Sequence, residues 1–278
     1  MKPLLILLAL LALTGCGGGE AADRSVPPER PAIVSLNPCI DAVLVEVADP
    51  RRILALSHWS RDPASSSLPP AVARRFAVTG GTVEEVLALQ PDLVLAGSFL
   101  DPATRGALRR LGVRVETFGI AATLDENEAQ VRRIAALAGD EAAGERLVDR
   151  MRAALRRAAP PPGERAVDTV LWQPGGIVPG QGTLIAELLR RAGFANGAAA
   201  RGYAQADYLP LEEVAADPPE LLLIAGGEAG QRHSVLSRLS ETKVERLDPA
   251  LLYCGGPTII AAAERLAQLR RDMAERPR

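Results

Sequence analysis

The chain has 278 residues, of which 47% are hydrophobic and 24% are charged, a composition typical of a globular protein with a substantial core. Its formal net charge is -2, and the many arginines are scattered among acidic residues, so no basic field exists to attract nucleic acid. The composition therefore argues against a nucleic-acid-binding protein and leaves room for one large domain or two modest lobes.

The first segment is typical of an export signal. Lys2 precedes an apolar run from Leu4 to Leu13 that is too short for a permanent membrane helix, which needs about 20 apolar residues. Leu13-Thr14-Gly15-Cys16 resembles a bacterial lipobox. The resemblance implies that residues 1–15 are a lipoprotein signal peptide and that Cys16 is the acylated N-terminus. The alternative is an ordinary signal peptide in which this cysteine occurs by chance.

The segment after the signal is predicted to be a flexible tether. Residues 16–30 are rich in Gly, Ala, Pro and charged residues, which suits a linker between a lipid anchor and a folded body. One acyl chain alone binds a bilayer only marginally, so stable anchoring would depend on several chains. We therefore expect a periplasmic protein that is lipid-anchored to a membrane.

From residue 31, short apolar runs alternate with longer helical patterns, which is typical of an α/β fold. The run Leu93-Val94-Leu95-Ala96 is continuous and contains no alternating polar residues, as expected for a parallel strand that is covered on both faces. These patterns predict an N-terminal α/β lobe over residues 31–139, with strands near residues 32–36, 53–56, 92–96 and 113–116.

One strong amphipathic helix is predicted from Asp140 to Ala158. Its apolar residues recur every fourth position, at Ala143, Leu147, Met151 and Leu155. An acidic start, an Arg-rich last turn and the run Pro160-Pro161-Pro162-Gly163 define its ends. The helix would be almost 30 Å long at about 1.5 Å per residue, enough to brace one lobe against another. Residues 140–160 are therefore predicted to be an interdomain helix, and the alternative is a surface helix within one domain.

The α/β pattern returns after this helix. Apolar runs at residues 166–172, 221–225 and 244–247 predict strands, and residues 182–192 and 257–273 predict helices. The segment 161–278 is therefore predicted to be a C-terminal α/β lobe.

A short repeat links the two halves. Residues 83–95, VEEVLALQPDLVL, align without gaps to residues 211–223, LEEVAADPPELLL, at a constant offset of 128. The alignment places Glu84 on Glu212 and Pro91 on Pro219. Each copy reads as an acidic helix, a proline break and a buried strand, so the repeat favours two pseudo-symmetric halves.

These features resemble the periplasmic-binding family for ferric siderophores and cobalamin, the helical-backbone class of substrate-binding lipoproteins of ABC importers. The resemblance covers about residues 31 to 275. Besides the repeat and the long helix, it depends on three segments, namely Ile33-Val34-Ser35-Leu36-Asn37-Pro38, Gly80-Gly81, and Gly182-Thr183-Leu184 to Ala192-Gly193-Phe194-Ala195-Asn196. It implies an α/β fold of two Rossmann-like lobes with central, mostly parallel sheets joined by one long interdomain helix.

The resemblance also implies a function. The protein would be a monomer without enzymatic activity that captures a metal chelate, a ferric siderophore or cobalamin, between its lobes. It would deliver that chelate to an ABC permease dimer with its ATPase. In the family one glutamate on each lobe pairs with permease arginines, and the matching positions are Glu84 and Glu212. Their neighbours Glu85 and Glu213 are the alternatives.

Candidate ligand contacts come from the few aromatic residues, which make up 3% of the chain, and from one arginine in each half. Aromatic walls suit a flat chelate, and arginine suits an anionic one. The candidates are Trp59, Arg61, Trp172, Arg201, Tyr203 and Tyr208. For Trp172 and Tyr208, packing in the core is an equal alternative.

Cys39 and Cys254 lie near opposite ends of the folded region, in an exported chain. A disulfide between them and two buried free thiols are equally compatible with the sequence.

Two other function classes are the alternatives. No P-loop, dinucleotide fingerprint or G-x-S-x-G elbow is present, so nothing supports an exported α/β hydrolase. A receptor for bare zinc or manganese would need clustered ligands, and His58 and His233 are too few and too far apart in sequence. No cofactor is expected. The choice between ferric siderophore and cobalamin stays open, with a slight preference for iron chelates.

Overall fold

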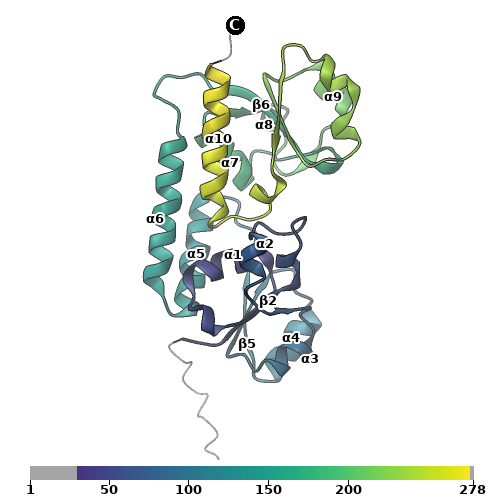
Figure 1. Ribbon diagram of the computed structural model, residues 1–278. Coiled ribbons are helices and arrows are strands. Elements are labelled where there is room, and N and C mark those ends of the chain that lie inside the picture. The colour runs from purple at the N-terminus through teal and green to yellow at the C-terminus, as the bar shows by residue number, and fades with distance from the viewer. Residues whose placement is uncertain (1–29, 276–278) are drawn as a thin grey trace, which may run out of the picture.

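The computed structural model describes residues 30–275 and places them in two lobes, each built on its own parallel sheet (Figure 1). The signal peptide, Cys16 and all of the predicted tether except its last residue lie outside the described residues. Within residues 30–275, no helix combines the length and the hydropathy that a membrane span requires.

The first lobe is a five-stranded parallel sheet covered on both faces. Its strands are β1 (Ile33–Ser35), β2 (Ile53–Ser57), β3 (Val78–Thr79), β4 (Leu93–Gly97) and β5 (Arg114–Phe118), in the order β3-β2-β1-β4-β5. Its helices are α1 (Pro38–Val47), α2 (Pro70–Ala73), α3 (Val83–Ala88), α4 (Pro102–Arg110) and α5 (Leu124–Ala138). Local sequence sets the start of α1, because Asn37 accepts hydrogen bonds from the N–H groups of Cys39 and Ile40 and Pro38 follows it.

The second lobe repeats this plan with four parallel strands. They are β6 (Val167–Trp172), β8 (Phe194–Asn196), β10 (Leu221–Ala225) and β11 (Lys243–Leu247), in the order β11-β10-β6-β8. The antiparallel pair β7 (Ile177–Val178) and β9 (Asp207–Tyr208) lies beside this sheet. The helices are α7 (Leu184–Arg191), α8 (Gly197–Ala200), α9 (Leu211–Ala216) and α10 (Thr258–Ala274). The predicted α/β architecture with two parallel sheets is confirmed.

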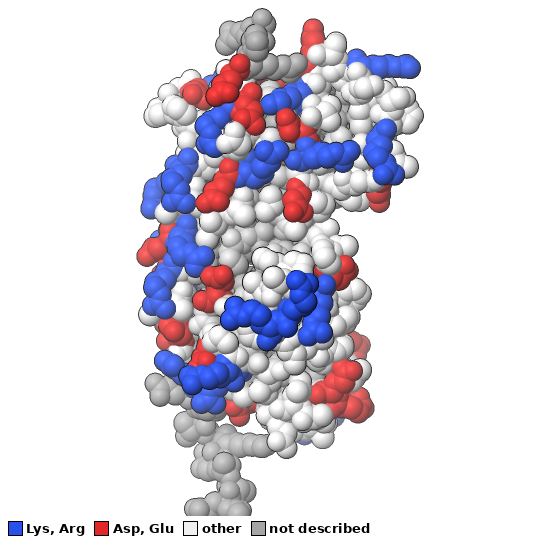
Figure 2. All heavy atoms as spheres, viewed as in Figure 1, with Lys and Arg blue, Asp and Glu red and all other residues white. Residues whose placement is uncertain are grey.

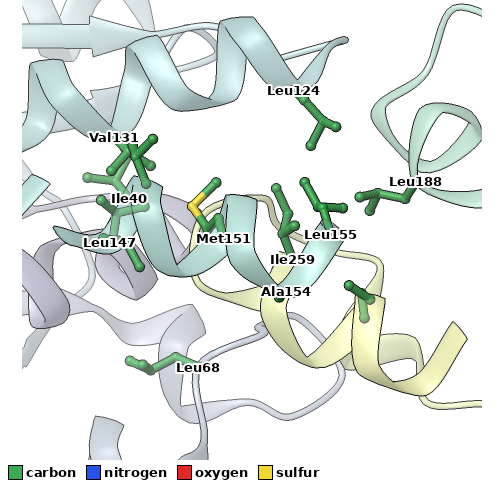
Figure 3. Close-up of a cluster of buried hydrophobic side chains, with 14 of the residues drawn as sticks. Ile40, Leu68, Leu124, Val131, Leu147, Met151, Ala154, Leu155, Leu188 and Ile259 are labelled. Atoms are coloured by element: carbon green, nitrogen blue, oxygen red, sulfur yellow. The ribbon is translucent and has the colours of Figure 1, made fainter. Parts of the chain in front are cut away.

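The long helix α6 (Glu141–Ala158) runs along one side of both lobes and packs against α5 and α10 (Figure 1). Asp140 caps its start by accepting from the N–H of Ala143. Leu147, Met151 and Leu155 project from α6 into a cluster that also contains Ile40 of α1 and Ile259 of α10 (Figure 3). One continuous core therefore links elements of the first lobe to elements of the second.

The repeat is exact at the level of structure. The bounds of α3 and β4 shifted by 128 residues are the bounds of α9 and β10. Asp92 accepts the N–H of Ala32 beside β1, and its counterpart Glu220 accepts the N–H of Asp168 in β6. The two halves thus share a helix, a strand and the carboxylate that ties that strand to its neighbour.

Candidate ligand-binding cleft

A cavity of about 290 Å³ lies between the two lobes. On the first lobe its walls are the start of α1, α5 and the loops that follow β4 and β5. On the second lobe they are residues 182–188, Gln205 and the turn 251–256 before α10. The cavity therefore opens at the carboxyl ends of parallel strands, the usual position of ligands in α/β sheets.

The loops after β4 and β5 present large apolar side chains at this cavity. Phe99 is 84% exposed and Ile120 is 79% exposed, and both line it. From the other lobe comes Tyr253, which is 40% exposed. Exposed apolar side chains that gather at one hollow are typical of a binding surface. The three residues, called the apolar platform below, give this cavity an exposed apolar surface.

The polar groups of the cavity wall are neutral. They include the side-chain amides of Asn37, Gln130 and Gln205 and the hydroxyls of Ser98 and Thr183. Among the described residues that line the cavity, none is Asp, Glu, Lys, Arg or His. In Figure 2 the surface between the lobes is mostly uncharged, whereas charged side chains are spread over both lobes. The described wall of this cavity is therefore uncharged.

Tyr253 is held in its neutral form. Burial raises the pKa of its phenol above the ordinary value, and the carboxylates of Asp248 and Asp62 raise it further. Asp62 follows the loop that carries Trp59, so this loop lies within electrostatic reach of the second lobe. The two charges that raise the pKa of this phenol are therefore both negative.

Three ties join the lobes beside the cavity. Cys39 and Cys254 form a disulfide with a Cα–Cα distance of 5.0 Å. Of the two alternatives that the sequence left open, a disulfide and two free thiols, the structure contains the disulfide. The N–H of Gly256 donates to Asn127 at 2.9 Å, and the N–H of Leu124 donates to Glu187 at 2.8 Å. Each tie connects the first lobe to the second, which fixes the base of the cleft.

The six predicted ligand contacts are absent from the described wall of this cavity. Trp172 is 4% exposed and donates its indole N–H to the carbonyl of Leu209 at 2.9 Å, because the end of β6 points into the core of the second lobe. Arg201 is held by Asp217, to which it donates at 2.6 Å. The structure therefore places these two residues away from the cleft.

The other four candidates lie outside the long helices and the central sheet. Trp59 and Arg61 belong to the 3₁₀ helix His58–Arg61 after β2, Tyr203 lies in a loop, and Tyr208 ends β9. Arg61 donates to the carbonyl of Phe76 at 2.8 Å and thereby holds its own loop. Trp59 is 51% exposed and its ring contacts His58 at 4.5 Å between centroids. Tyr203 is half-buried, and Tyr208 is 57% exposed. Tyr203 and Tyr208 flank Gln205, which does line the cavity.

Sequence reasoning about side chains missed Phe99, Ile120 and Gln205. For Phe99 and Ile120, position in the sequence could have identified them as candidates. Both come just after one of two adjacent strands, and α/β folds bind ligands at strand ends. Asn37 and Tyr253, in the turns that precede α1 and α10, also line the cavity.

A buried carboxyl supports the loop that carries Trp59. Asp41 of α1 is fully buried and accepts from the N–H of Ser57 at 2.9 Å and the hydroxyl of Ser60 at 2.5 Å. Burial raises the pKa of Asp41 from 3.8 to about 7, although the hydrogen bonds to Ser57 and Ser60 oppose this rise. Asp41 thus shapes the β2 end of the first lobe without reaching the cavity itself.

The two acidic repeat helices lie far from α6. In the view of Figure 1, α3 and α9 are at the two ends of the molecule, both on the side away from α6. Glu84, Glu212 and Glu213 are exposed. Glu85 accepts from the hydroxyl of Thr79 at 2.9 Å, and this bond lowers the pKa of Glu85 below its ordinary value. Glu85 is therefore engaged within its own lobe, whereas Glu84 faces solvent.

Between residues 30 and 275, no group of three or more His, Cys, Asp or Glu side chains is placed to hold a metal ion.

Comparison with known proteins agrees with this geometry. A family model described as periplasmic binding protein matches residues 33–244. A cobalamin-binding protein of Halobacterium salinarum is 31% identical over 181 residues, which cover 62% of this chain and 47% of the relative. The match thus spans about half the length of that relative.

Solved structures share the fold. The periplasmic heme-binding protein RhuT from Roseiflexus sp. RS-1 has a TM-score of 0.70 and 22% identity, with 88% of this chain and 100% of that chain covered. The periplasmic vitamin B12 binding protein BtuF of Vibrio cholerae has a TM-score of 0.67 and 18% identity, with 90% and 99% covered. At these identities the likeness shows the two-lobed fold alone.

Proposed function

The chain belongs to the periplasmic binding protein family, whose model matches residues 33–244, and on that basis we propose that it is the substrate-binding component of an ABC importer. It captures a metal chelate in the cleft between its lobes and delivers it, chemically unchanged, to a permease. The observation that carries this proposal is the cavity at the carboxyl ends of the strands, with an apolar platform of Phe99, Ile120 and Tyr253.

The names of the similar proteins support a chelate as cargo. One relative is named for binding cobalamin, and structures of the same fold are named for binding heme and vitamin B12. These cargoes share a flat macrocycle around a metal. An apolar platform suits the face of such a ring because the ring covers side chains that water would otherwise contact.

Delivery is assigned to the two acidic helices. Glu84 on α3 and Glu212 on α9 are exposed carboxylates at equivalent positions of the repeat. A single exposed ion pair contributes only about 0 to 1 kcal/mol, whereas two pairs fix orientation and speed the encounter. We assign them to permease docking, with an ATPase-driven permease dimer as the partner.

The remaining assignments complete this proposal. Segments 31–139 and 161–278 act as the lobes and segment 140–160 as the spacer between them. Cys16 carries the lipid that anchors a periplasmic monomer to a membrane. We retain Trp59, Tyr203 and Tyr208 as contacts for the part of a large cargo that extends beyond the cavity, since Trp59 and Tyr208 are exposed and the two tyrosines flank Gln205 of the cavity wall.

Titration calorimetry with cyanocobalamin, a ferric hydroxamate and a ferric catecholate tests the proposal. We expect saturable binding of at least one chelate at one molecule per protein, with the chelate recovered unaltered by chromatography. Accumulation of a converted product, or the absence of any binding across the three chelates, would overturn it.

A further inference from the structure

The wall of the cleft differs in charge from the rest of the protein. About a quarter of the chain is charged, at 24% of residues, yet the described residues around the cavity include no ionised side chain. From this wall we infer that the cargo is an uncharged chelate with an amide-bearing rim, and that anionic chelates are rejected. This inference rests on the proposed function and narrows its substrate class.

The first argument is the cost of burying charge. A carboxylate or catecholate that leaves water must gain a charged or strongly donating partner, or its desolvation remains uncompensated. Arginine is the usual partner for such groups. The two arginines that the sequence offered are committed elsewhere, Arg61 to the carbonyl of Phe76 and Arg201 to Asp217. An anionic cargo would therefore enter the cleft without a counter-charge.

The second argument is the sign of the nearest charges. Asp62 of the first lobe and Asp248 of the second both act on the phenol of Tyr253, which lines the cavity. Two carboxylates within electrostatic reach of this phenol oppose the approach of an anion. They leave a neutral cargo unaffected.

The third argument is the match between the neutral polar groups and an amide rim. Gln205 reaches the cavity from the second lobe, and Gln130 reaches it from the first while its Nε2 donates to the carbonyl of Gly119 at 2.9 Å. Asn37 uses its oxygen to cap α1, which leaves its Nδ2 as a donor. Side-chain amides both donate and accept, and so do the primary amides on a ligand. The cavity wall can therefore pair with an amide rim on both lobes.

The fourth argument concerns the ring face. Phe99 and Ile120 follow adjacent strands of the first lobe and are 84% and 79% exposed. Their exposure leaves a large apolar area in water until a ligand covers it. We assign these two side chains to the flat face of the macrocycle, with the amide rim of the cargo directed toward Gln205.

Two corrinoids that differ in rim charge provide a matched test. Dicyanocobinamide carries amides around the corrin ring, and dicyanocobyrinic acid carries carboxylates at the corresponding positions. Titration of the full chain with each should show that the carboxylate form binds at least about 100-fold more weakly, the expected result of burying charge without a partner.

The outcomes separate the inference from the proposed function. Equal or tighter binding of the carboxylate corrinoid, or binding of only a ferric tris-catecholate, overturns the neutral-cargo inference and leaves the proposed function standing. Binding of none of these three probes, nor of cyanocobalamin or a ferric hydroxamate, overturns both. Binding of the ferric hydroxamate alone overturns only the inference.

Single variants test which side chains of the cavity wall determine the affinity for a corrinoid. Phe99→Ala and Ile120→Ala should each weaken cobinamide binding by roughly 10-fold, the size expected for losing one apolar side chain at a contact. Leu111→Ala is the control, because Leu111 is 56% exposed but lies outside the cavity wall. Gln205→Arg adds a cation to the cavity wall. It should reduce the difference in affinity between the amide and the carboxylate corrinoid by about 10-fold. An unchanged difference in this variant would contradict the inference.

Discussion

The amide oxygen of Asn127, near the start of α5, accepts a hydrogen bond of 2.9 Å from the N–H of Gly256, which lies in the other lobe. The neighbouring Gly255 leaves the space that the Asn127 side chain occupies, since a Cβ at Gly255 would lie 2.0 Å from Nδ2 of Asn127. This pair of residues closes the base of the cleft beside the disulfide.

Gly255→Ala should therefore displace Asn127 and loosen the base of the cleft. We expect the free energy of unfolding to fall by about 1–3 kcal/mol, as for other overpacked sites, and the affinity for the cargo to fall with it. Chemical denaturation and ligand titration measure the two effects. Gly227→Ala is the matched control, because a Cβ at Gly227 meets nothing within 4 Å. Equal stability of the two variants would contradict the close approach.

Reduction of the disulfide should lower the melting temperature. Cys39 and Cys254 are 215 residues apart, and a crosslink over a long segment typically stabilises a protein by about 2–4 kcal/mol. Thermal unfolding with and without a reductant gives the measurement. In the double variant Cys39→Ala with Cys254→Ala, the melting temperature should already be low and should no longer respond to reductant. A wild-type protein that is indifferent to reductant would count against this crosslink.

The buried carboxyl of Asp41 should make stability depend on pH. Its pKa is about 7 in the folded protein and near 3.8 otherwise, so the folded state retains a proton that the unfolded state releases between these values. The corresponding stability is fully present below pH 3.8 and is lost as the pH rises through about 7.

Asp41→Asn keeps the shape of the side chain and removes its titration. Melting temperatures of this variant and of the wild type, followed from pH 4 to pH 8, isolate the contribution of Asp41 by difference. We expect the wild type to lose more stability than the variant over that range. Parallel curves would show that the carboxyl titrates outside this window.

Removal of both carboxylates proposed for permease docking should affect transport but not cargo binding. In the double variant Glu84→Ala with Glu212→Ala, we expect affinity for the permease to fall by roughly 10-fold or more, since two oriented ion pairs are lost. Each single variant should show a smaller effect. Cargo-stimulated ATPase activity of the reconstituted permease provides the measurement.

The matched control for docking is Glu141→Ala with Asp149→Ala, two exposed acids on α6. It removes the same net charge from the opposite side of the molecule. Equal losses in the two double variants would mean that overall charge, and not the position of α3 and α9, determines permease binding.

The sequence predicted the fold well where apolar runs are long. The predicted strand at residues 221–225 is β10 itself, and the predicted helix from Asp140 to Ala158 differs from α6 only at its capping residue. The short strands β3, β7 and β9 were missed because two residues carry no periodicity. Their conformation depends on neighbours that are distant in the sequence.

The cleft was harder to predict for a different reason. Trp172 was proposed as a ligand contact because it is aromatic. Its indole N–H instead donates to a carbonyl inside the core, and its ring packs there. The residues that line the cavity are mostly small, apolar or amide-bearing, and such residues occur throughout the chain. Only their position after a strand distinguishes Phe99 and Ile120, and that position becomes informative once the order of strands is known.

Strand β4 has one further consequence. Its N-terminal end follows α3, which carries Glu84, and its C-terminal end leads directly to Phe99. Leu93 and Leu95 pack on one face and Val94 on the other, so the strand is clamped from both sides. Were the proposed permease to displace Glu84, β4 would thus transmit that displacement as a rigid body to the part of the cavity wall formed by Phe99.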